Sequence, residues 1–300
     1  MPSPASDNAV PGLDPVAALR WASRTADTSP WLHEEVASRM AERLRWFREP
    51  PASWLHWEPV NGGLQAHGRL LEQLPRAASF VAARDGQRTL AALRGPRPAW
   101  HPAQWMRRAP SRLATAQTQV AMLWANMVLH MEPEPGQLLR HWHSRIETGG
   151  FLMFSSLGPD SLRALRLVHA RHGWPEPAHA FTDMHDWGDM LVQVGFAEPV
   201  MDMERITLSY SSADTLLTEL RGLGRNLSLS RHPSLRGRAW RARWCEAVEQ
   251  GLPRSPDGRL LLDFEVVYGH AFKAAPRVPV SASSTVSVDD MRALLRAGRR

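Results

Sequence analysis

The sequence has a single cysteine and no long run of apolar residues. Because Cys245 stands alone among 300 residues, the chain cannot form an internal disulfide or a metal site built from paired thiolates. The first residues, MPSPASDNAVPG, lack the charged start and apolar run of a secretory signal, and no segment approaches the roughly 18 apolar residues of a membrane helix. We therefore expect a protein of the reducing cytoplasm with no membrane association.

The positive charge comes almost entirely from arginine. The 36 basic residues exceed the 30 acidic ones, for a formal net charge of +6. Such an excess favours an acidic partner, whether nucleic acid, a membrane surface or an acidic protein. The arginines are spread over many segments, however, and no zinc-finger spacing or basic run with interleaved aromatics is present, so we expect no nucleic-acid partner. Ordinary solvated arginine is an equally good interpretation.

The stretch from 119 to 166 predicts one β-α-β unit. Val120 to Trp124 and Phe151 to Phe154 are short apolar runs, and Glu134 to Ile146 has helical spacing between them. We expect the two runs to be adjacent parallel strands inside a sheet. Ligands of open α/β sheets bind where the strands end. Polar residues gather at both predicted ends, namely Asn126, His130, Ser155, Ser156, Gly158 and Asp160.

Turn residues and apolar spacing predict the other elements. Further strands are expected at Trp54 to Trp57, Ala78 to Ala83 and, as an antiparallel pair, Arg205 to Tyr210 and Leu260 to Phe272; the run at Val120 to Trp124 belongs to a fourth strand over Gln117 to Trp124. Helices are expected after Asp14 and Ser29, and at 63–74, 161–172, 183–194, 212–221 and 238–250. The region from 87 to 112 gives no clear assignment. Residues 13–275 should form one domain, after a disordered start at 1–12 and before a loose tail at 276–300 with at most a short basic helix.

Five motifs follow one another in a fixed order: ANMVLH at 125–130, FLMFSSLGPDSLRALR at 151–166, FTDMHDWGD at 181–189, VGFAEPVMD at 194–202 and VYGHAF at 267–272. Together they resemble the class I S-adenosylmethionine-dependent methyltransferases and, within them, the malonyl-acyl-carrier-protein O-methyltransferases of biotin synthesis. Members typically show SNLALHW, then FST.GPDTL.ELR, then F.DMHDLGD. The resemblance covers about residues 19–272.

The resemblance implies an α/β, Rossmann-like class I methyltransferase fold, with a mostly parallel seven-stranded sheet, helices on both faces and an antiparallel late hairpin. It implies S-adenosylmethionine as the cofactor and the malonyl carboxylate on acyl carrier protein as the methyl acceptor. It also implies a natural partner for a basic surface, because acyl carrier protein is strongly acidic.

The expected cofactor loop departs from the family pattern. Members typically end the first strand in LDLGCGTG, because the backbone must approach the cofactor closely; here WLHWEPVNGG runs from 54 to 63, so two glycines remain. Ala26 also stands where the family commonly has a tyrosine. Asp85, near the end of the second strand, would bond the ribose hydroxyls of the cofactor, although a surface turn at Asp85-Gly86 is the alternative interpretation. The predicted cofactor contacts are Glu58, which replaces the acid if the loop is shifted, Gly62, Gly63, Asp85 and Asn126.

The acceptor carboxylate is already ionised, so transfer needs positioning and charge neutralisation more than a base. Arginine and histidine side chains at the strand ends are the candidates for binding this carboxylate. For each of them, a solvent-facing arginine or a histidine bonded to the backbone is the simpler interpretation. Asp160 and Asp183 are interpreted as helix caps. His141 and His143 diverge on a helix, so no metal site is expected. The candidates for binding the substrate are His130, Arg163, Arg166, His185 and Arg225.

Three functions stay open at this stage. The first is methyl transfer to a malonyl thioester on acyl carrier protein. The weakened cofactor loop favours a second, a catalytically weak or inactive binding or assembly protein that kept the fold and a partner surface. A third follows relatives that assist assembly of respiratory complex I, where the same fold acts on a protein arginine.

Overall fold

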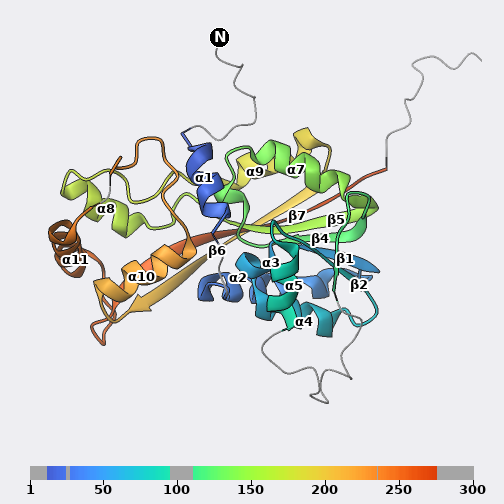
Figure 1. Ribbon diagram of the computed structural model, residues 1–300, viewed down its shortest axis with the longest axis horizontal. Coiled ribbons are helices and arrows are strands. Elements are labelled where there is room, and N and C mark those ends of the chain that lie inside the picture. Colours follow the sequence, from blue (N-terminus) through green and yellow to red (C-terminus); the bar gives the residue numbers. More distant parts are fainter. Residues whose placement is uncertain (1–11, 25–27, 95–110, 235, 276–300) are drawn as a thin grey trace, which may run out of the picture.

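The computed structural model describes residues 12–24, 28–94, 111–234 and 236–275 (Figure 1). Within them seven strands form one sheet in the order β3-β2-β1-β4-β5-β7-β6. The first five strands run parallel, and β7 is antiparallel to both of its neighbours. This confirms the expected mostly parallel sheet with a late antiparallel hairpin. The strands are β1 Ser53–Trp57, β2 Ala78–Ala82, β3 Arg112–Leu113, β4 Val120–Ala125, β5 Ile146–Leu157, β6 Ala197–Tyr210 and β7 Leu260–Phe272.

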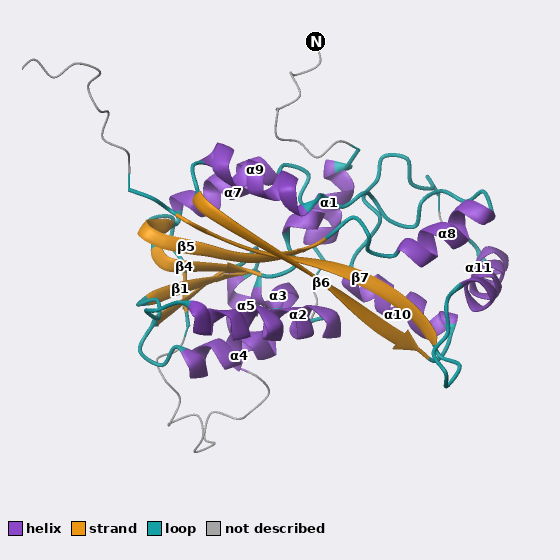
Figure 2. Ribbon diagram, turned by 180° about the vertical axis from the view of Figure 1, so that it is seen from behind, coloured by secondary structure: helices purple, strands orange, loops and turns teal. Residues whose placement is uncertain are grey.

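Helices cover both faces of the sheet. Figure 2 shows α2 to α5 on one face, α7 and α9 on the other, and α8, α10 and α11 gathered at the far end of the β6–β7 hairpin. The helices are α1 Pro15–Ala22, α2 Trp31–Glu42, α3 Pro59–Gly62, α4 Leu64–Gln73, α5 Gly86–Arg94, α7 Pro135–Ser144, α8 Arg163–Arg171, α9 Met184–Val194, α10 Ala213–Leu223 and α11 Arg238–Gly251, with short 3₁₀ turns η1 Arg43–Trp46 and η2 Leu129–Met131.

The two faces of the sheet have separate cores because side chains alternate along each strand. Trp54 and Trp124 pack with the apolar residues of α2 and α4. Leu55 and Leu123, their neighbours in β1 and β4, pack instead with α7 and α9. All four side chains are fully buried. Burial on both faces explains why the central strands appear in the sequence as continuous apolar runs.

The predicted neighbours β4 and β5 are adjacent and parallel, with Trp124 opposite Met153. The predicted strand at 151–154 is too short, however, because β5 begins at Ile146, where the sequence suggested a helix. Gly149 and Gly150 form a bulge inside the strand, and a Cβ on Gly150 would lie 2.6 Å from the carbonyl oxygen of Ala121. The glycine pair is therefore part of the sheet, and α7 ends before it.

The strand predicted at 205–210 is likewise only the last part of β6, which begins at Ala197. β6 lies at the edge of the sheet and most of its first half is exposed, so no apolar run marks it. In the region without a clear assignment, α5 and β3 are described, and residues 95–110 lie outside the described residues. The expected tail, Ala26 and nearly all of the expected disordered start also lie outside them. No helix in the described part of the chain is long and apolar enough to cross a membrane.

Candidate functional site

Backbone strain is concentrated at the carboxyl edge of the sheet. Glu58 follows β1, Met127 follows β4 and Leu162 follows β5, with φ angles of 49°, 56° and 63°. Left-handed backbone is costly for a residue with a Cβ and persists where the surroundings impose it, often at functional sites. Of the other non-glycine residues that the structure describes, only Glu198 in β6 has a positive φ. The strain therefore marks the ends of three adjacent parallel strands.

Glu58 joins the end of β1 to the chain after β2. Its backbone N–H donates to the carbonyl oxygen of Ala82 at 2.7 Å, and its Oε1 accepts from the backbone N–H of Arg84 at 2.8 Å. Burial raises the pKa of the Glu58 carboxyl above its ordinary value. The residue thus takes a backbone conformation that favours glycine and brings a carboxylate to the place where the acid of the cofactor loop is expected.

The rest of this loop is a tight helical turn, α3, followed by Gly63 with φ 121°. A Cβ on Gly62 would lie 3.0 Å from His56 Nε2, and one on Gly63 would lie 3.1 Å from a carboxylate oxygen of Glu34. That carboxylate accepts from the backbone N–H groups of Gln65 and Ala66, so it caps α4. The backbone angle of Gly63 therefore favours glycine, and a side chain at Gly62 would press against His56.

Asn126 is fully buried and ties three segments together. Its Nδ2 donates to the carbonyl oxygens of His33 at 2.8 Å and Gly62 at 2.6 Å. Its Oδ1 accepts from the hydroxyl of Ser155 in β5 at 2.6 Å. Since an amide nitrogen carries two N–H groups, both are used in these bonds. Asn126 consequently fixes the position of the β1–α4 loop.

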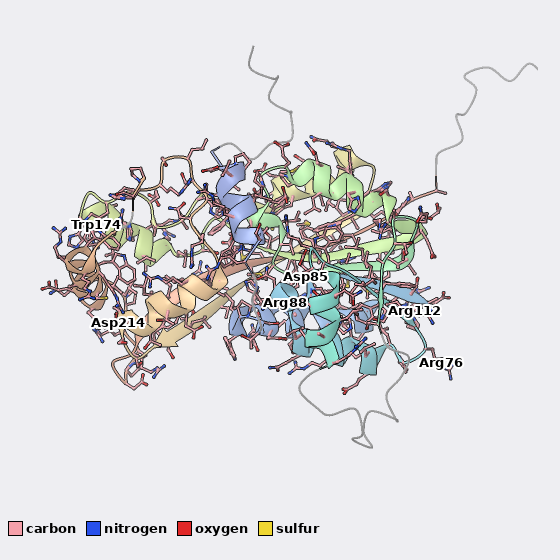
Figure 3. The ribbon with its side chains drawn as sticks, viewed as in Figure 1. Arg76, Asp85, Arg88, Arg112, Trp174 and Asp214 are labelled. Carbon is pink, nitrogen blue, oxygen red and sulfur yellow. The ribbon has the colours of Figure 1, made fainter. Side chains whose placement is uncertain are left out.

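Asp85 is exposed at the start of α5, where its Oδ1 accepts from the backbone N–H of Arg88 at 3.0 Å (Figure 3). This capping bond matches the alternative interpretation of a surface turn. The predicted cofactor residues Glu58, Gly62, Gly63, Asp85 and Asn126 therefore lie at the ends of β1, β2 and β4, along one edge of the sheet.

Three buried histidines lie beside Asn126, and two of them were missed in the sequence. His33 Nδ1 donates to the carbonyl oxygen of Asn61 at 2.8 Å, which fixes the neutral tautomer and leaves Nε2 as an acceptor. Burial lowers the pKa of His33 to about 4. His179 Nε2 donates to the carbonyl oxygen of His130, and its Nδ1 accepts from the backbone N–H of Leu227. Neither His33 nor His179 lies in any of the five sequence motifs given above.

His130, a predicted substrate residue, is buried at the end of β4. Burial, and then the neighbouring His33 and His179, keep the pKa of His130 well below its ordinary value. Among the described residues, neither His130 Nδ1 nor His33 Nε2 has a hydrogen-bond partner. Buried polar atoms are nearly always paired, so these two unpaired ring nitrogens are an exception that marks a candidate site.

The other predicted substrate residues have different surroundings. Arg166 forms an ion pair with Glu176 at 2.8 Å and donates to the carbonyl oxygen of His179 at 2.8 Å, so it braces the segment that carries His179. Arg163 is exposed on α8, and Arg225 is exposed beside Trp21. In the part of the chain that the structure describes, no hydrogen bond, ion pair or ring contact joins Arg163, His185 or Arg225 to His130.

His185 is exposed, and its Nδ1 lies 2.7 Å from the Asp183 carboxylate. Asp183 also caps α9, as predicted, by accepting from the backbone N–H of His185. The predicted cap at Asp160 is wrong, because α8 begins later without a side-chain cap and Asp160 Oδ2 lies 3.7 Å from the Arg205 guanidinium. No group of three metal-binding side chains occurs in the described ranges.

A separate pair of buried histidines, His56 and His67, lies next to the cofactor loop. His56 in β1 and His67 in α4 approach to 3.1 Å between their Nδ1 atoms, and His67 Nε2 lies 2.8 Å from the hydroxyl of Ser111. Burial lowers the pKa of His67 to about 4, and that of His56 well below its ordinary value. His56 Nε2 has no partner in the described part of the chain and points toward Gly62. The strand pattern alone did not indicate this polar contact.

Comparison with known proteins gives relatives along most of the chain. The chain is 38% identical over 266 residues to a malonyl-[acyl-carrier protein] O-methyltransferase of Gallionella capsiferriformans, covering 84% of this chain and 87% of that protein. It is 35% identical over 275 residues to a protein of the same name from Laribacter hongkongensis, covering 85% and 87%. No family model matches.

Solved structures show the same fold at low sequence identity. A candidate methyltransferase of Bacillus halodurans superposes with a TM-score of 0.50 at 12% identity, over 80% of this chain and all of that one. The YcgJ protein of Bacillus subtilis gives a TM-score of 0.51 at 7% identity, over 79% and 99%. These likenesses concern the class I methyltransferase fold alone.

Proposed function

The chain belongs to the family of malonyl-[acyl-carrier protein] O-methyltransferases, and we propose that it transfers a methyl group from S-adenosylmethionine to the free carboxylate of malonyl-acyl carrier protein. As the family resemblance implies, this reaction would serve biotin synthesis. The lone Cys245 is compatible with the reducing cytoplasm as its setting.

The structural observation that supports this proposal is the convergence at the carboxyl edge of the sheet. Strained turns follow β1, β4 and β5, and two buried histidine nitrogens without partners lie beside them. Ligands of open α/β sheets bind at this edge. The edge thus offers both acceptors and donors of hydrogen bonds in a largely buried setting.

The chemistry of this edge fits S-adenosylmethionine. The cofactor would supply an electrophilic methyl group on a sulfonium, and its amine and ribose hydroxyls are hydrogen-bond donors. The hydrogen-bond acceptors on the protein are the carboxylates of Glu58 and Asp85 and the unprotonated Nε2 of His33. Gly62 and Gly63 let the turn pack closely, and Asn126 holds that turn against β4. These residues would hold the cofactor.

The acceptor carboxylate needs orientation and a partner for its charge. His130 is neutral near pH 7 because burial lowers its pKa, and a neutral imidazole donates one N–H to a carboxylate. The edge of the His130 ring meets Phe181 at 5.8 Å between centroids, so the site is apolar on that side and excludes water. Arg166 holds the segment from 176 to 181 and therefore acts as a positioning residue.

A non-catalytic binding protein is the second candidate, and one observation favours it. Both N–H groups of Asn126 and the space around Gly62 are taken up by contacts within the protein. A loop closed in this way resembles a remodelled cofactor site. Calorimetric titration with S-adenosylmethionine and its demethylated product separates the two candidates, because only the enzyme needs to bind them.

Methyl transfer is tested directly with purified components. The protein is incubated with S-adenosylmethionine and malonyl-acyl carrier protein, and the carrier is examined by mass spectrometry for replacement of a proton by a methyl group. Acetyl-acyl carrier protein, which has no free carboxylate, is the matched control substrate. We expect the malonyl form alone to be methylated; cofactor binding with no methylation of it would refute this acceptor, and no cofactor binding would support the second candidate.

A further inference from the structure

The first helix of the domain has an exposed apolar face. In α1, Ala18 is the buried residue, while Val16 and Leu19 are each 55% exposed. Residues three apart lie on the same side of a helix, so these two side chains form one patch. Leu229, 65% exposed, joins it at one end because its backbone N–H donates to the carbonyl oxygen of Gly12 at 2.7 Å. Contiguous exposed apolar side chains often mark interaction sites.

Arginines gather at the other end of α1. The guanidinium carbon of Arg24 lies 5.0 Å from the centroid of the Trp21 ring, and that of Arg225 lies 5.4 Å from it. Arg225 also donates to the carbonyl oxygen of Arg221 at 2.7 Å. Burial, then Arg24 and Arg221, lower the pKa of Arg225. No described carboxylate forms an ion pair with any of these three arginines, so their charge is not offset there.

The charge at this end of α1 differs from that of a groove elsewhere on the surface. The groove of about 800 Å³ between α2 and β6 also contains arginines. There, however, Arg39 forms ion pairs with Glu35 and Glu204, and Arg43 forms one with Asp202. That groove is balanced in charge, whereas the end of α1 is not.

The arginines adjoin the candidate site. A Cβ on Gly224, the residue before Arg225, would lie 3.5 Å from the side chain of Met131, which follows His130. Leu227, two residues after Arg225, donates a backbone hydrogen bond to Nδ1 of His179. The Nε2 of the same ring donates to the carbonyl oxygen of His130. Figure 1 shows α1 between α8 and the pair α7 and α9. A partner on α1 would therefore stand at the border of the carboxyl edge.

We propose that this α1 surface, formed by Val16, Leu19, Arg24, Arg221, Arg225 and Leu229, docks the acyl carrier protein that presents the malonyl group. The inference rests on the proposed function for the identity of the partner. An acidic protein with apolar residues among its carboxylates complements a surface that combines unpaired arginines with exposed aliphatic side chains. Arg225, expected from the sequence to bind substrate, would then contact the carrier and leave the malonyl group to His130.

Binding of malonyl-acyl carrier protein to the full chain tests the proposal and does not depend on catalysis. Arg221→Glu and Leu19→Ser change the two chemical parts of the surface separately. Arg76→Glu makes the same charge change at an exposed residue at the opposite end of the molecule from α10 (Figure 3), and is the matched control. We expect Arg221→Glu to weaken binding about tenfold or more, because a carboxylate facing the acidic carrier is repelled. Leu19→Ser should weaken binding less, and Arg76→Glu should leave it unchanged.

Salt and a small substrate complete the test. Added salt should weaken carrier binding by the wild type more than by Arg221→Glu. If the chain methylates malonyl-pantetheine, which has no carrier protein, both α1 variants should retain that rate. Equal carrier binding by Arg221→Glu and wild type would overturn the proposal, as would a wild type that does not bind the carrier. Dimerisation abolished by Leu19→Ser would identify a second copy as the occupant instead. Carrier binding without methyl transfer would leave the docking surface standing and refute the proposed function.

Discussion

The side-chain amide nitrogen of Asn126 lies 2.6 Å from the carbonyl oxygen of Gly62, although 64 residues separate them in the chain. The same nitrogen reaches His33 in α2, so one buried side chain links the first helical layer, the cofactor loop and β4. Its oxygen extends the link to Ser155 in β5. The relative positions of these four segments therefore depend on one amide.

Replacing this amide should destabilise the protein strongly. Asn126→Ala removes the buried bonds that its side chain donates to the carbonyl oxygens of His33 and Gly62 and the one that it accepts from Ser155, and a buried polar group left unpaired costs about 1 to 3 kcal/mol. We expect a loss of roughly 2 to 5 kcal/mol in the free energy of unfolding, measured with urea. Asn226→Ala, which removes bonds at an exposed turn, is the control and should cost about 1 kcal/mol or less. Equal losses in the two variants would contradict the linking role of Asn126.

Gly62 should be essential for binding of the cofactor. A Cβ there would crowd His56 and the backbone at Asn126, so Gly62→Val must shift the turn. We expect titration calorimetry to detect no binding of S-adenosylmethionine by this variant while its circular dichroism spectrum stays native. Gly68→Ala is the matched control, because a Cβ at that helical position meets nothing within 4 Å. Unchanged affinity in Gly62→Val would place the cofactor elsewhere.

The wild type itself should bind the cofactor weakly. A loop with one glycine pair, an acid shifted to Glu58 and an exposed Asp85 offers fewer hydrogen bonds than the family pattern, and each lost bond costs about 1 kcal/mol or more. Summed, this corresponds to about a hundredfold in affinity relative to a family member that keeps LDLGCGTG. Side-by-side calorimetry of the two proteins measures the difference. Rescue of a biotin-requiring strain that lacks its own methyltransferase would show that the variant loop works.

His130 should matter more than His185 for methyl transfer. His130→Ala removes a buried donor beside the carboxyl edge, whereas His185→Ala removes an exposed ring at the start of α9. We expect the first change to lower kcat/KM about tenfold to a hundredfold, or roughly 1 to 3 kcal/mol of binding in the transition state. The second should change it less than threefold. The reverse order would assign acceptor binding to the α9 end.

Acid should weaken the fold through its buried histidines. The pKa of His33 and that of His67 are lowered to about 4 by burial, from 6.5. Between pH 4 and pH 6.5 the unfolded chain therefore binds protons at these histidines and the folded chain does not. Above about pH 6.5 both states are neutral at these rings and no stability is lost. As the pH falls from 6.5 toward 4, the free energy of unfolding decreases by up to about 3 kcal/mol for each histidine.

Urea unfolding at pH 7.5 and pH 5 measures this loss. Wild type should lose stability over that interval, and His67→Gln should lose less, whatever its stability at pH 7.5. His232→Gln changes an exposed histidine and should keep the dependence of the wild type. A dependence identical in His67→Gln and wild type would show that other groups control the acid response.

The sequence predicted the central sheet because its strands are buried on both faces. A continuous apolar run marked β4, and the late strands β6 and β7 were correctly predicted to pair antiparallel. The full length of β5 and β6 was missed for local reasons. A glycine bulge interrupts the pattern of β5, and β6 is exposed at the edge of the sheet.

The positions of the candidate site residues were predicted in part. Glu58, Gly62 and Asn126 could be placed together because strand ends meet at one edge. The bonding state of the histidines could not be predicted, because it depends on partners far away in the chain. His33 meets the carbonyl of Asn61, His179 meets Leu227, and His56 meets His67 from another element. Such contacts follow from tertiary packing and have no local sequence signal.

The position of β7 also constrains how the chain is made. In the described part of the chain β6 pairs with β7 alone, and β7 separates it from β5. On the ribosome, β5 and β6 therefore emerge with open edges and stay unpaired until the residues up to Phe272 have left the exit tunnel. Open strand edges invite aggregation, and pairings distant in sequence form slowly. A nascent chain stalled before Leu260 is thus the form of this protein most in need of a chaperone.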